Sequence, residues 1–261
     1  MPAARPPCLR RGALRIAALA LALLLGTPAW RGAAAQPAAP AAAASGLAAH
    51  ALLVYRTTAE FHFGGLPLSM SARTTTSWRL DGRVYETHLH MDRVDFDQLS
   101  HGEVGADGAF APTRYTEKRP FHDPESVAID WVAGEIRYGA GPKSAAPPPG
   151  AQDRLSLQFE LARRRLSHPE QFAPGSRHEV RLIGTHDVDP WMFEVGAEES
   201  VETGRGALHA VRCSARRTVG TAVETIDIWL GAELSWLPVR IRMVDRKGAV
   251  IDSVLQSAEL P

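Results

Sequence analysis

Four side chains between Tyr85 and Asp92 are of the types that perform chemistry. Glu86, His88, His90 and Asp92 recur at every second residue. Alternate residues of a β-strand share one face, so the two imidazoles would lie about 7 Å apart, between two carboxylates. Imidazole and carboxylate groups are ligands for zinc and other transition metals. The spacing therefore makes these four residues candidate metal ligands of a metal-dependent hydrolase.

The same segment has a second interpretation that needs no metal. The polar residues alternate with Tyr85, Thr87, Leu89 and Met91, which is the pattern of a half-buried strand. The order His-x-His-x-Asp is similar to an element of some metallohydrolases, but a further His normally follows there, and Arg93 follows here. A metal site also needs ligands from distant parts of the chain. We therefore expect the polar face of an amphipathic strand, and we assign no catalytic residue, metal or cofactor.

Other polar groups precede prolines or end a helix. The groups before prolines are His186, Asp187 and Asp189 before Pro190, and His122 and Asp123 before Pro124. Because Asp and Pro favour turns, we expect turns rather than catalytic sites there. The run Arg163–Arg165 could contact an anionic headgroup or partner. We expect a solvated helix end, because cations suit the C-terminal end of a helix dipole.

Signatures of the common hydrolases and nucleotide-binding proteins are absent from the sequence. There is no Gly-x-Ser-x-Gly, Ser-x-x-Lys, His-Glu-x-x-His or Gly-x-x-x-x-Gly-Lys. Catalytic groups assemble in space, so this absence is weak evidence. Because only the histidine face favours catalysis, we expect a protein that is not an enzyme.

The aromatic residues and the cysteine have structural interpretations. Five tryptophans lie in or beside strand-like segments: Trp78, Trp131, Trp191, Trp229 and Trp236. They could line an apolar ligand cavity, but core and sheet packing is the expected role. Cys213 follows Ala-Val-Arg in another strand-like segment, where we expect a buried small apolar residue rather than a reactive thiol.

Most of the chain has the period of two that is typical of strands. Apolar and other residues alternate over 85–91, 226–230 and 239–243. Glycine-containing hairpin signals separate such segments at Asp81-Gly82, Asp107-Gly108, Ala133-Gly134, Thr203–Gly206 and Lys247-Gly248. We count roughly ten strands, and their short connections predict an antiparallel sheet.

One segment has the period of a helix instead. Leu155, Phe159, Ala162 and Leu166 recur at four, three and four residues. Gln152-Asp153 supplies an acidic N-terminal cap, and His168-Pro169 ends the segment. The sequence therefore predicts a mainly β fold: a curved antiparallel sheet or open β-barrel with one central α-helix packed against its concave face.

Residues 1–35 have the layout of a secretory signal peptide. A start with four arginines and no acid precedes the apolar run Ile16–Leu25, which is half the length that a membrane-spanning helix needs. Small residues follow, with candidate cleavage sites after Ala35 and after Ala29. A retained anchor is the alternative. We expect export to the periplasm, and no stable transmembrane helix in the mature chain.

Cleavage after Ala35 would change the charge balance. The whole chain has 29 cations and 29 anions, and the leader holds five of the cations, so the mature protein would carry a net charge of −5. That charge argues against nucleic acid as a partner. Residues 36–50 are rich in Ala and Pro and predict a flexible linker. Residues 51–261 are expected to form a single β-rich domain.

Three stretches of the sequence resemble a known family. They are Pro148–Ser156, Asp187–Phe193, and Trp229–Gly231 together with Trp236–Arg242. With them, the chain resembles the exported bacterial family catalogued as domain of unknown function 3108, over about Leu52 to Leu260. The resemblance implies a periplasmic or envelope-associated β-rich protein without an assigned activity. It also implies an architecture similar to the lipoprotein carriers, in which a curved sheet holds an acyl chain.

These observations lead to three functional hypotheses. The first is a non-enzymatic periplasmic protein whose partner is an apolar or lipid-like ligand, or an envelope protein, held on the concave face. The second is the metal-dependent hydrolase that uses His88 and His90. The third is a structural scaffold of the cell envelope.

Overall fold

The computed structural model describes residues 46–139, 141 and 146–261, which belong to one compact unit. The expected signal peptide, and the expected linker up to residue 45, lie outside the described residues. Within the described part of the chain, no helix is both long and apolar enough to cross a membrane.

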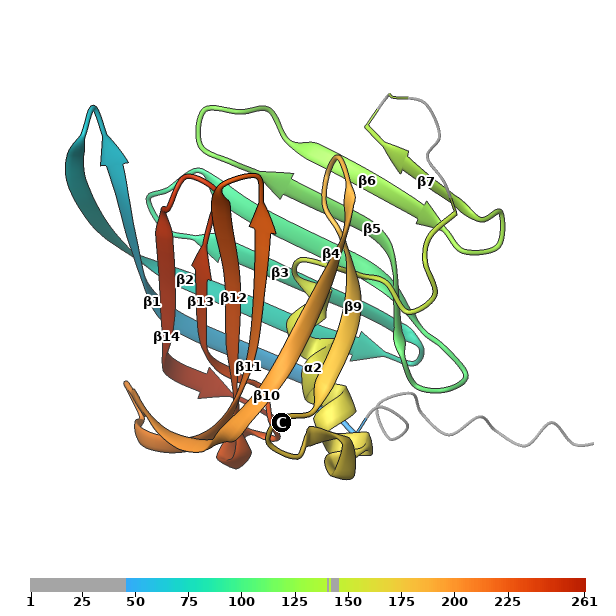
Figure 1. Cartoon of the computed structure of the whole chain (residues 1–261). Coiled ribbons are helices and arrows are strands. Elements are labelled where there is room, and N and C mark those ends of the chain that lie inside the picture. The colour runs from blue at the N-terminus through green and yellow to red at the C-terminus, as the bar shows by residue number, and fades with distance from the viewer. Residues whose placement is uncertain (1–45, 140, 142–145) are drawn as a thin grey trace, which may run out of the picture. The chain divides into compact units, whose positions relative to one another are not determined.

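A single sheet of fourteen strands forms the domain (Figure 1). The first seven strands are β1 (His50–Phe63), β2 (Leu66–Asp81), β3 (Val84–Met91), β4 (Phe96–Val104), β5 (Phe110–Lys118), β6 (Glu125–Asp130) and β7 (Glu135–Tyr138). The other seven are β8 (Gln152–Asp153), β9 (Arg177–Ile183), β10 (Val188–Thr203), β11 (Gly206–Val219), β12 (Ala222–Gly231), β13 (Pro238–Val244) and β14 (Val250–Glu259). Their order across the sheet is β7-β6-β5-β4-β3-β2-β1-β14-β13-β12-β11-β10-β9-β8.

The strand directions confirm the predicted antiparallel sheet, although the predicted number of strands was too low. Strands as short as β7 and β8 cannot show an alternation in sequence. All neighbouring strands are antiparallel except β8 and β9, which are parallel because α2 connects them. The five predicted hairpin signals lie at strand connections, and Gly82 (φ 58°) and Gly134 (φ 66°) adopt the left-handed backbone that favours glycine there.

Helix α2 spans Ser156–Ser167 and lies inside the curve of the sheet (Figure 1). Oδ1 of Asp153 accepts the backbone N–H groups of Leu155 and Ser156, each at 2.8 Å, so the predicted acidic residue does satisfy free donors at the helix start. Every residue from Ser156 to Arg163 is buried. The sheet therefore encloses the first two turns of the helix instead of covering one apolar stripe. Two short 3₁₀ helices complete the fold, η1 (Pro169–Phe172) and η2 (Ala232–Leu234).

The prediction of a solvated arginine cluster is wrong for Arg163. This residue is 6% exposed, and its Nε and Nη2 donate to the carboxylate of Glu160 at 2.7 and 2.8 Å. Glu160 is also buried and accepts Nε of Arg164 at 2.7 Å. Burial of a charged group requires a paired charge and hydrogen bonds, and Glu160 provides both.

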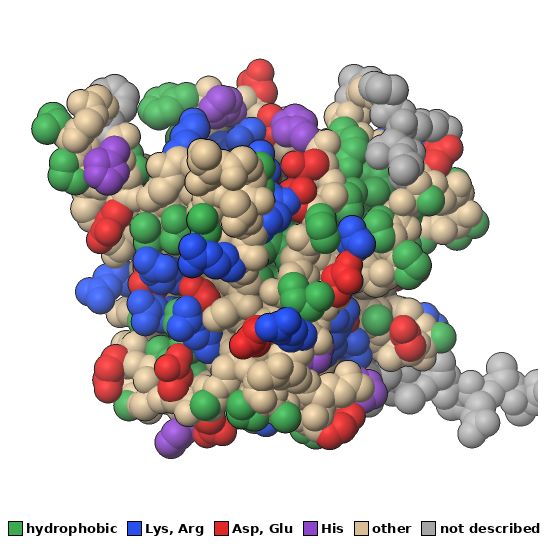
Figure 2. Space-filling view, viewed as in Figure 1, with side chains coloured by type: hydrophobic (Ala, Val, Ile, Leu, Met, Phe, Trp, Pro, Cys, Tyr) green, Lys and Arg blue, Asp and Glu red, His purple; other side chains and the backbone are tan. Residues whose placement is uncertain are grey.

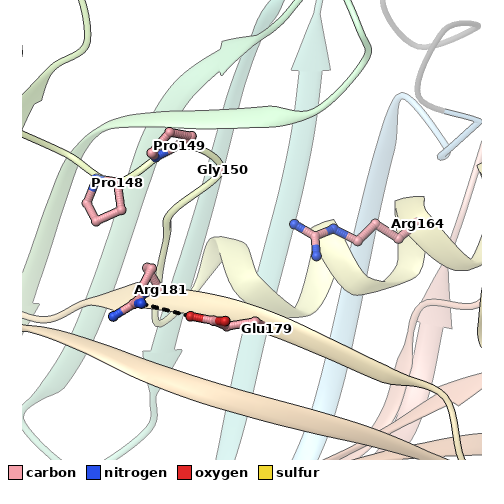
Figure 3. A pocket seen from close by; sticks show the side chains of 6 residues that line it. All are labelled: Pro148, Pro149, Gly150, Arg164, Glu179 and Arg181. Carbon is pink, nitrogen blue, oxygen red and sulfur yellow. Dashed lines mark ion pairs between the residues drawn. The ribbon is translucent and has the colours of Figure 1, made fainter.

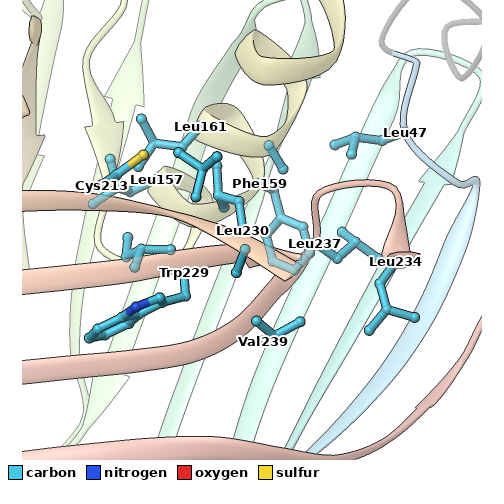
Figure 4. Close-up of a cluster of buried hydrophobic side chains, with 14 of the residues drawn as sticks. Leu47, Leu157, Phe159, Leu161, Cys213, Trp229, Leu230, Leu234, Leu237 and Val239 are labelled. Carbon is cyan, nitrogen blue, oxygen red and sulfur yellow. The ribbon is translucent and has the colours of Figure 1, made fainter. Parts of the chain in front are cut away.

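The helix and the sheet enclose the main hydrophobic core. Figure 4 shows Leu157, Phe159 and Leu161 of α2 close to Leu230 and Leu237. A second, smaller core lies where the two ends of the sheet meet, and it contains Tyr115, Val127, Ile129, Ile136, Ala151, Leu155 and Ile183. All five tryptophans named above belong to these cores or pack against them, as predicted.

The folded domain begins a few residues before the expected boundary. Leu47 is 4% exposed and belongs to the main core. The carbonyl of Ala48 accepts Nε1 of Trp78 at 2.9 Å, and the carbonyl of Ala49 accepts the N–H of Leu80 at 2.7 Å. The end of the expected linker is therefore anchored to β2.

Candidate ligand-binding face

Cross-strand pairing assigns each strand residue to the inner or the outer face of the curved sheet. Residues that are directly opposite each other on neighbouring strands share a face. Leu53, Tyr55 and Thr57 of β1 are buried, which places this side of the strand on the inner face. Ala59 and Phe61 follow at the same spacing of two and belong to the inner face as well.

A row of apolar residues crosses five strands on the inner face. It consists of Met70 (β2), Ala59 (β1), Ile251 (β14), Met243 (β13) and Ile226 (β12), and each is the register partner of the next. We call these five residues the inner row. Met70 is 40% and Met243 38% exposed, while the other three are half-buried. The inner row is thus an apolar surface that the helix does not cover.

Aromatic packing fills the inner face closer to the helix. The ring of Trp78 stacks on Phe159 of α2 with centroids 4.5 Å apart, and it lies 5.1 Å from Phe110 and 5.5 Å from Tyr85. These four side chains are at most 1% exposed. An apolar ligand on this fold therefore belongs at the inner row and not around the helix.

A charged cluster lies beside the inner row, two residues from Ile226 along β12 at Glu224 and at its register partner Arg217 on β11. Arg217 forms ion pairs with Asp189 and with Glu224, the latter at 2.5 Å, and Arg246 donates to Glu224 at 2.9 Å. The guanidinium of Arg217 also lies 4.9 Å from the ring centre of Trp191. Desolvation lowers the pKa of Arg217, but its hydrogen bonds to both carboxylates outweigh this and raise the pKa overall. The surface beside Ile226 is consequently charged, and its side chains are held by ion pairs.

The outer face of strands β11 to β14 carries ion pairs. Arg212 pairs with Asp227 at 2.9 Å and Arg240 with Asp252 at 2.5 Å, and both guanidinium groups lie within 5.0 Å of the ring centre of Trp229. Figure 2 shows basic and acidic side chains gathered over this face. The inner row is therefore apolar, whereas the outer face of β11–β14 carries paired charges.

A buried polar cluster joins the start of helix α2 to strand β4. Asp153 is fully buried, and its Oδ2 accepts the hydroxyl of Ser100 at 2.5 Å. Burial raises the pKa of Asp153 to about 6, against the opposing effect of its hydrogen bonds with Ser100, Ser156 and Leu155. The neighbouring hydroxyl of Tyr85 lies 3.4 Å from that of Ser100. This cluster fixes the helix position and has no contact with solvent.

The structure places the candidate metal ligands on the outer face of β3. Glu86, His88 and His90 are exposed, whereas Tyr85 and Thr87 are buried, as predicted for an amphipathic strand. Asp92 follows the strand. The structure adds Asp97, whose Oδ1 lies 3.0 Å from Nε2 of His88 and 3.0 Å from Nδ1 of His90. Among the described residues, no group of three or more His, Cys, Asp or Glu side chains could hold a metal ion.

The other polar residues that were singled out have structural contacts. Asp187 lies in the turn between β9 and β10, where its carbonyl accepts the N–H of Gly184, and His122 lies in the turn between β5 and β6. The turn prediction is wrong for Asp189, which lies in β10 and pairs with Arg217. Its strand position follows from pairing with β9, which a Pro at the next residue concealed.

Cys213 is buried in the main core, as predicted. Its side chain is 0% exposed, and burial raises the pKa of the thiol to about 12. A thiol that stays protonated is a poor nucleophile. Cys213 therefore has a packing role.

Two surface pockets are lined in part by charged side chains. One, of about 440 Å³, is lined by Pro148, Pro149, Gly150, Arg164, Glu179 and Arg181 (Figure 3). Its cation Arg181 is paired with Glu179 at 2.9 Å. The other, of about 400 Å³, is lined by Glu103, Thr113, Ala128, Ile129, Asp130, Trp131, Val132 and Arg137. Neither pocket is an apolar cavity for an acyl chain.

Sequence reasoning missed the inner row and the hairpin from which it extends. The alternation of Leu66, Leu68 and Met70 with Pro67, Ser69 and Ser71, directly after Gly64-Gly65, was a signal for this strand. The row itself could not be found, because it joins two residues of the β1–β2 hairpin to three residues of β12, β13 and β14, near the other end of the chain.

One family model and several solved structures match this chain. The family described as "Protein of unknown function (DUF3108)" matches residues 57–254. A solved β-barrel-like protein of domain of unknown function DUF1849 from Brucella abortus is 12% identical, with 82% of this chain and 99% of that chain covered at a TM-score of 0.53. A DUF1329 family protein from Desulfovibrio piger is 12% identical over 85% and 93% of the two chains, with a TM-score of 0.26. No curated protein matches the sequence.

Proposed function

The chain belongs to the DUF3108 family of proteins of unknown function, and from that premise we propose that it is a non-enzymatic periplasmic protein that binds an acyl-chain ligand along the inner row. The observation that carries the proposal is the apolar, half-exposed surface of five register-paired residues inside a curved sheet. The family match and the β-barrel-like relative support the fold, and the basic leader with its short apolar run supports export.

The dimensions and chemistry of the inner row suit an extended apolar ligand. Neighbouring strands lie about 4.8 Å apart, so a row across five strands is about 19 Å long, comparable to a long acyl chain. Met70 and Met243 carry flexible thioether side chains, which adapt to ligands of varied shape. The charged cluster of Arg217, Glu224 and Arg246 limits the apolar surface on the side of the row that Glu224 occupies. The polar group of the ligand would lie there or in solvent.

Titration with the fluorescent probe 1-N-phenylnaphthylamine tests this proposal. We expect saturable binding with one site per chain, and at least a tenfold loss of affinity in Met243→Glu, which places a charge in the inner row. Met192→Glu is the matched control, because Met192 is 45% exposed on the outer face of β10. Absence of saturable binding, or an equal loss in the two variants, would refute the proposal. Co-purification with envelope proteins and no bound lipid would favour the scaffold function instead.

A further inference from the structure

The hairpin of β1 and β2 extends beyond the packed part of the sheet. All residues from Leu66 to Ser71 are exposed, whereas Thr74, Thr76 and Trp78 of the same strand are buried. The inner side of this projection carries Leu66 (68% exposed) and Leu68 (45% exposed), the second of which is paired with Phe61. Such a contiguous exposed apolar surface is uncommon on a soluble domain unless it contacts a partner.

A second apolar projection lies at the same end of the sheet. Antiparallel pairing brings the β1–β2, β3–β4 and β5–β6 turns to one end, which we call the open end, and Figure 1 shows the β1–β2 and β5–β6 turns there. Phe121 in the β5–β6 turn is 102% exposed and has φ 64°. This backbone region is disfavoured for a bulky side chain, and Asn, Asp or Gly would fit it better. The turn therefore holds an aromatic ring in solvent at a conformational cost.

We infer that the open end docks on a lipid bilayer, with the β1–β2 tip and Phe121 inserted among the acyl chains. This interaction lies beyond ligand binding at the inner row. The residues that insert are Phe61, Leu66, Leu68 and Phe121.

The charge around these residues fits a bilayer surface of no particular sign. Residues 61–72 contain no Asp, Glu, Lys or Arg. The turns at the open end carry both cations and anions, such as Arg93 with Asp92 and Lys247 with Asp245. Insertion would therefore be driven by apolar burial and would depend only weakly on ionic strength.

Separate projections also fit a bilayer better than a second protein. A stable protein interface buries about 800 Å² on each partner with close shape complementarity. Here the apolar side chains lie on two projections, with a charged turn, Asp92–Asp95, between β3 and β4. A bilayer interface is deformable and accepts both projections at once, and aromatic rings are favoured at its boundary.

Co-sedimentation of the protein, as purified from cells, with phosphatidylcholine vesicles tests the inference. We expect binding that changes by less than twofold between 50 and 500 mM NaCl. Phe121→Asp and Leu66→Asp should each weaken partitioning at least tenfold. Both sites are exposed, and Asp tolerates the backbone of Phe121, so these variants should fold. Val132→Asp is the matched control, because Val132 is 100% exposed in the β6–β7 turn at the opposite end.

Several outcomes would overturn the inference. They are no sedimentation of the wild type, unchanged partitioning of both variants, or loss of binding at 500 mM NaCl, which would indicate headgroup charge. A dimer in gel filtration that Leu66→Asp dissociates would assign the tip to a second copy of the chain. Phe121 lies outside the inner row, so Phe121→Asp should bind 1-N-phenylnaphthylamine like the wild type. Failure of vesicle binding alone thus refutes docking, and failure of probe binding alone refutes the proposed function.

Discussion

Ser100 donates a hydrogen bond of 2.5 Å to Oδ2 of Asp153, although 53 residues separate them in the chain. This bond connects β4, on the back of the sheet, to the residue that also caps the N-terminus of α2. Both side chains are fully buried. Asp153 therefore holds the start of the central helix against β4.

The pKa of Asp153 predicts that this carboxyl makes a contribution to stability that is lost as the pH rises through about 6. Burial raises this pKa from 3.8 in the unfolded reference to about 6. A raised pKa means that the folded state binds the proton more tightly between these values, so the contribution of Asp153 to stability is greatest below pH 4 and falls up to about pH 6. The contribution is at most on the order of 3 kcal/mol.

Urea unfolding at pH 4.5 and pH 7 measures this effect. Asp153→Asn keeps the acceptor for the helix N–H groups but does not titrate. We expect the free energy of unfolding to change less with pH in this variant than in the wild type. Identical pH profiles for the two proteins would contradict the prediction.

We predict that the thiol of Cys213 reacts only after the protein unfolds. It is 0% exposed, and its raised pKa, about 12, keeps it protonated at pH 8. Ellman's reagent should therefore not detect the thiol of Cys213 in the native protein. In 6 M guanidinium chloride it should detect one thiol per chain if the expected leader is cleaved, because cleavage after Ala35 would also remove Cys8. Two thiols, or an intact mass that includes residues 1–35, would show that the leader is retained.

Sequence patterns were sufficient wherever the physics is local. The hairpin at Asp81-Gly82 and the alternation over β3 depend on neighbours within a few residues, and both predictions were confirmed. The burial of Arg163 could not be predicted in the same way. It depends on Glu160 being enclosed by the sheet, which is a property of the assembled fold. Likewise, the inner row exists only through the register of five strands.

We predict that removal of the two histidine side chains on β3 has only a small effect on the free energy of unfolding. The side chains of His88 and His90 are 46% and 49% exposed, and both contact Asp97. Exposed ion pairs contribute about 0–1 kcal/mol, so the double variant His88→Ala/His90→Ala should unfold within about 1 kcal/mol of the wild type. Metal analysis of the untagged protein should find no zinc bound in stoichiometric amount. One zinc per chain, lost in the double variant, would revive the hydrolase hypothesis.

We predict that Glu125 stabilises the contact between the two ends of the sheet, β6 and the β9–β10 turn. Its carboxylate accepts the hydroxyl of Thr185 at 2.9 Å and Nη2 of Arg119 at 2.7 Å, and it lies 3.1 Å from Nε2 of His186. Desolvation raises the pKa of Glu125, but these partners outweigh it and lower the pKa overall. A lowered pKa stabilises the fold above the unfolded value, and this contribution is lost as the pH falls through the folded value.

Glu125→Gln should therefore weaken the contact between the β9–β10 turn and β6, which covers the smaller core. The β9–β10 turn pairs with no strand of the β1–β7 half of the sheet, and the carboxylate of Glu125 adds hydrogen bonds between this turn and β6 to the apolar contacts of the smaller core. We expect a loss of about 1–2 kcal/mol at pH 7 and faster amide hydrogen exchange at residues 183–188. Glu179→Gln is the control, because the ion pair of Glu179 with Arg181 is exposed. Equal amide exchange rates and equal unfolding free energies in the two variants would contradict this prediction. The contact between the β9–β10 turn and β6 would then rest on the packing of Ile183, Tyr115 and Val127.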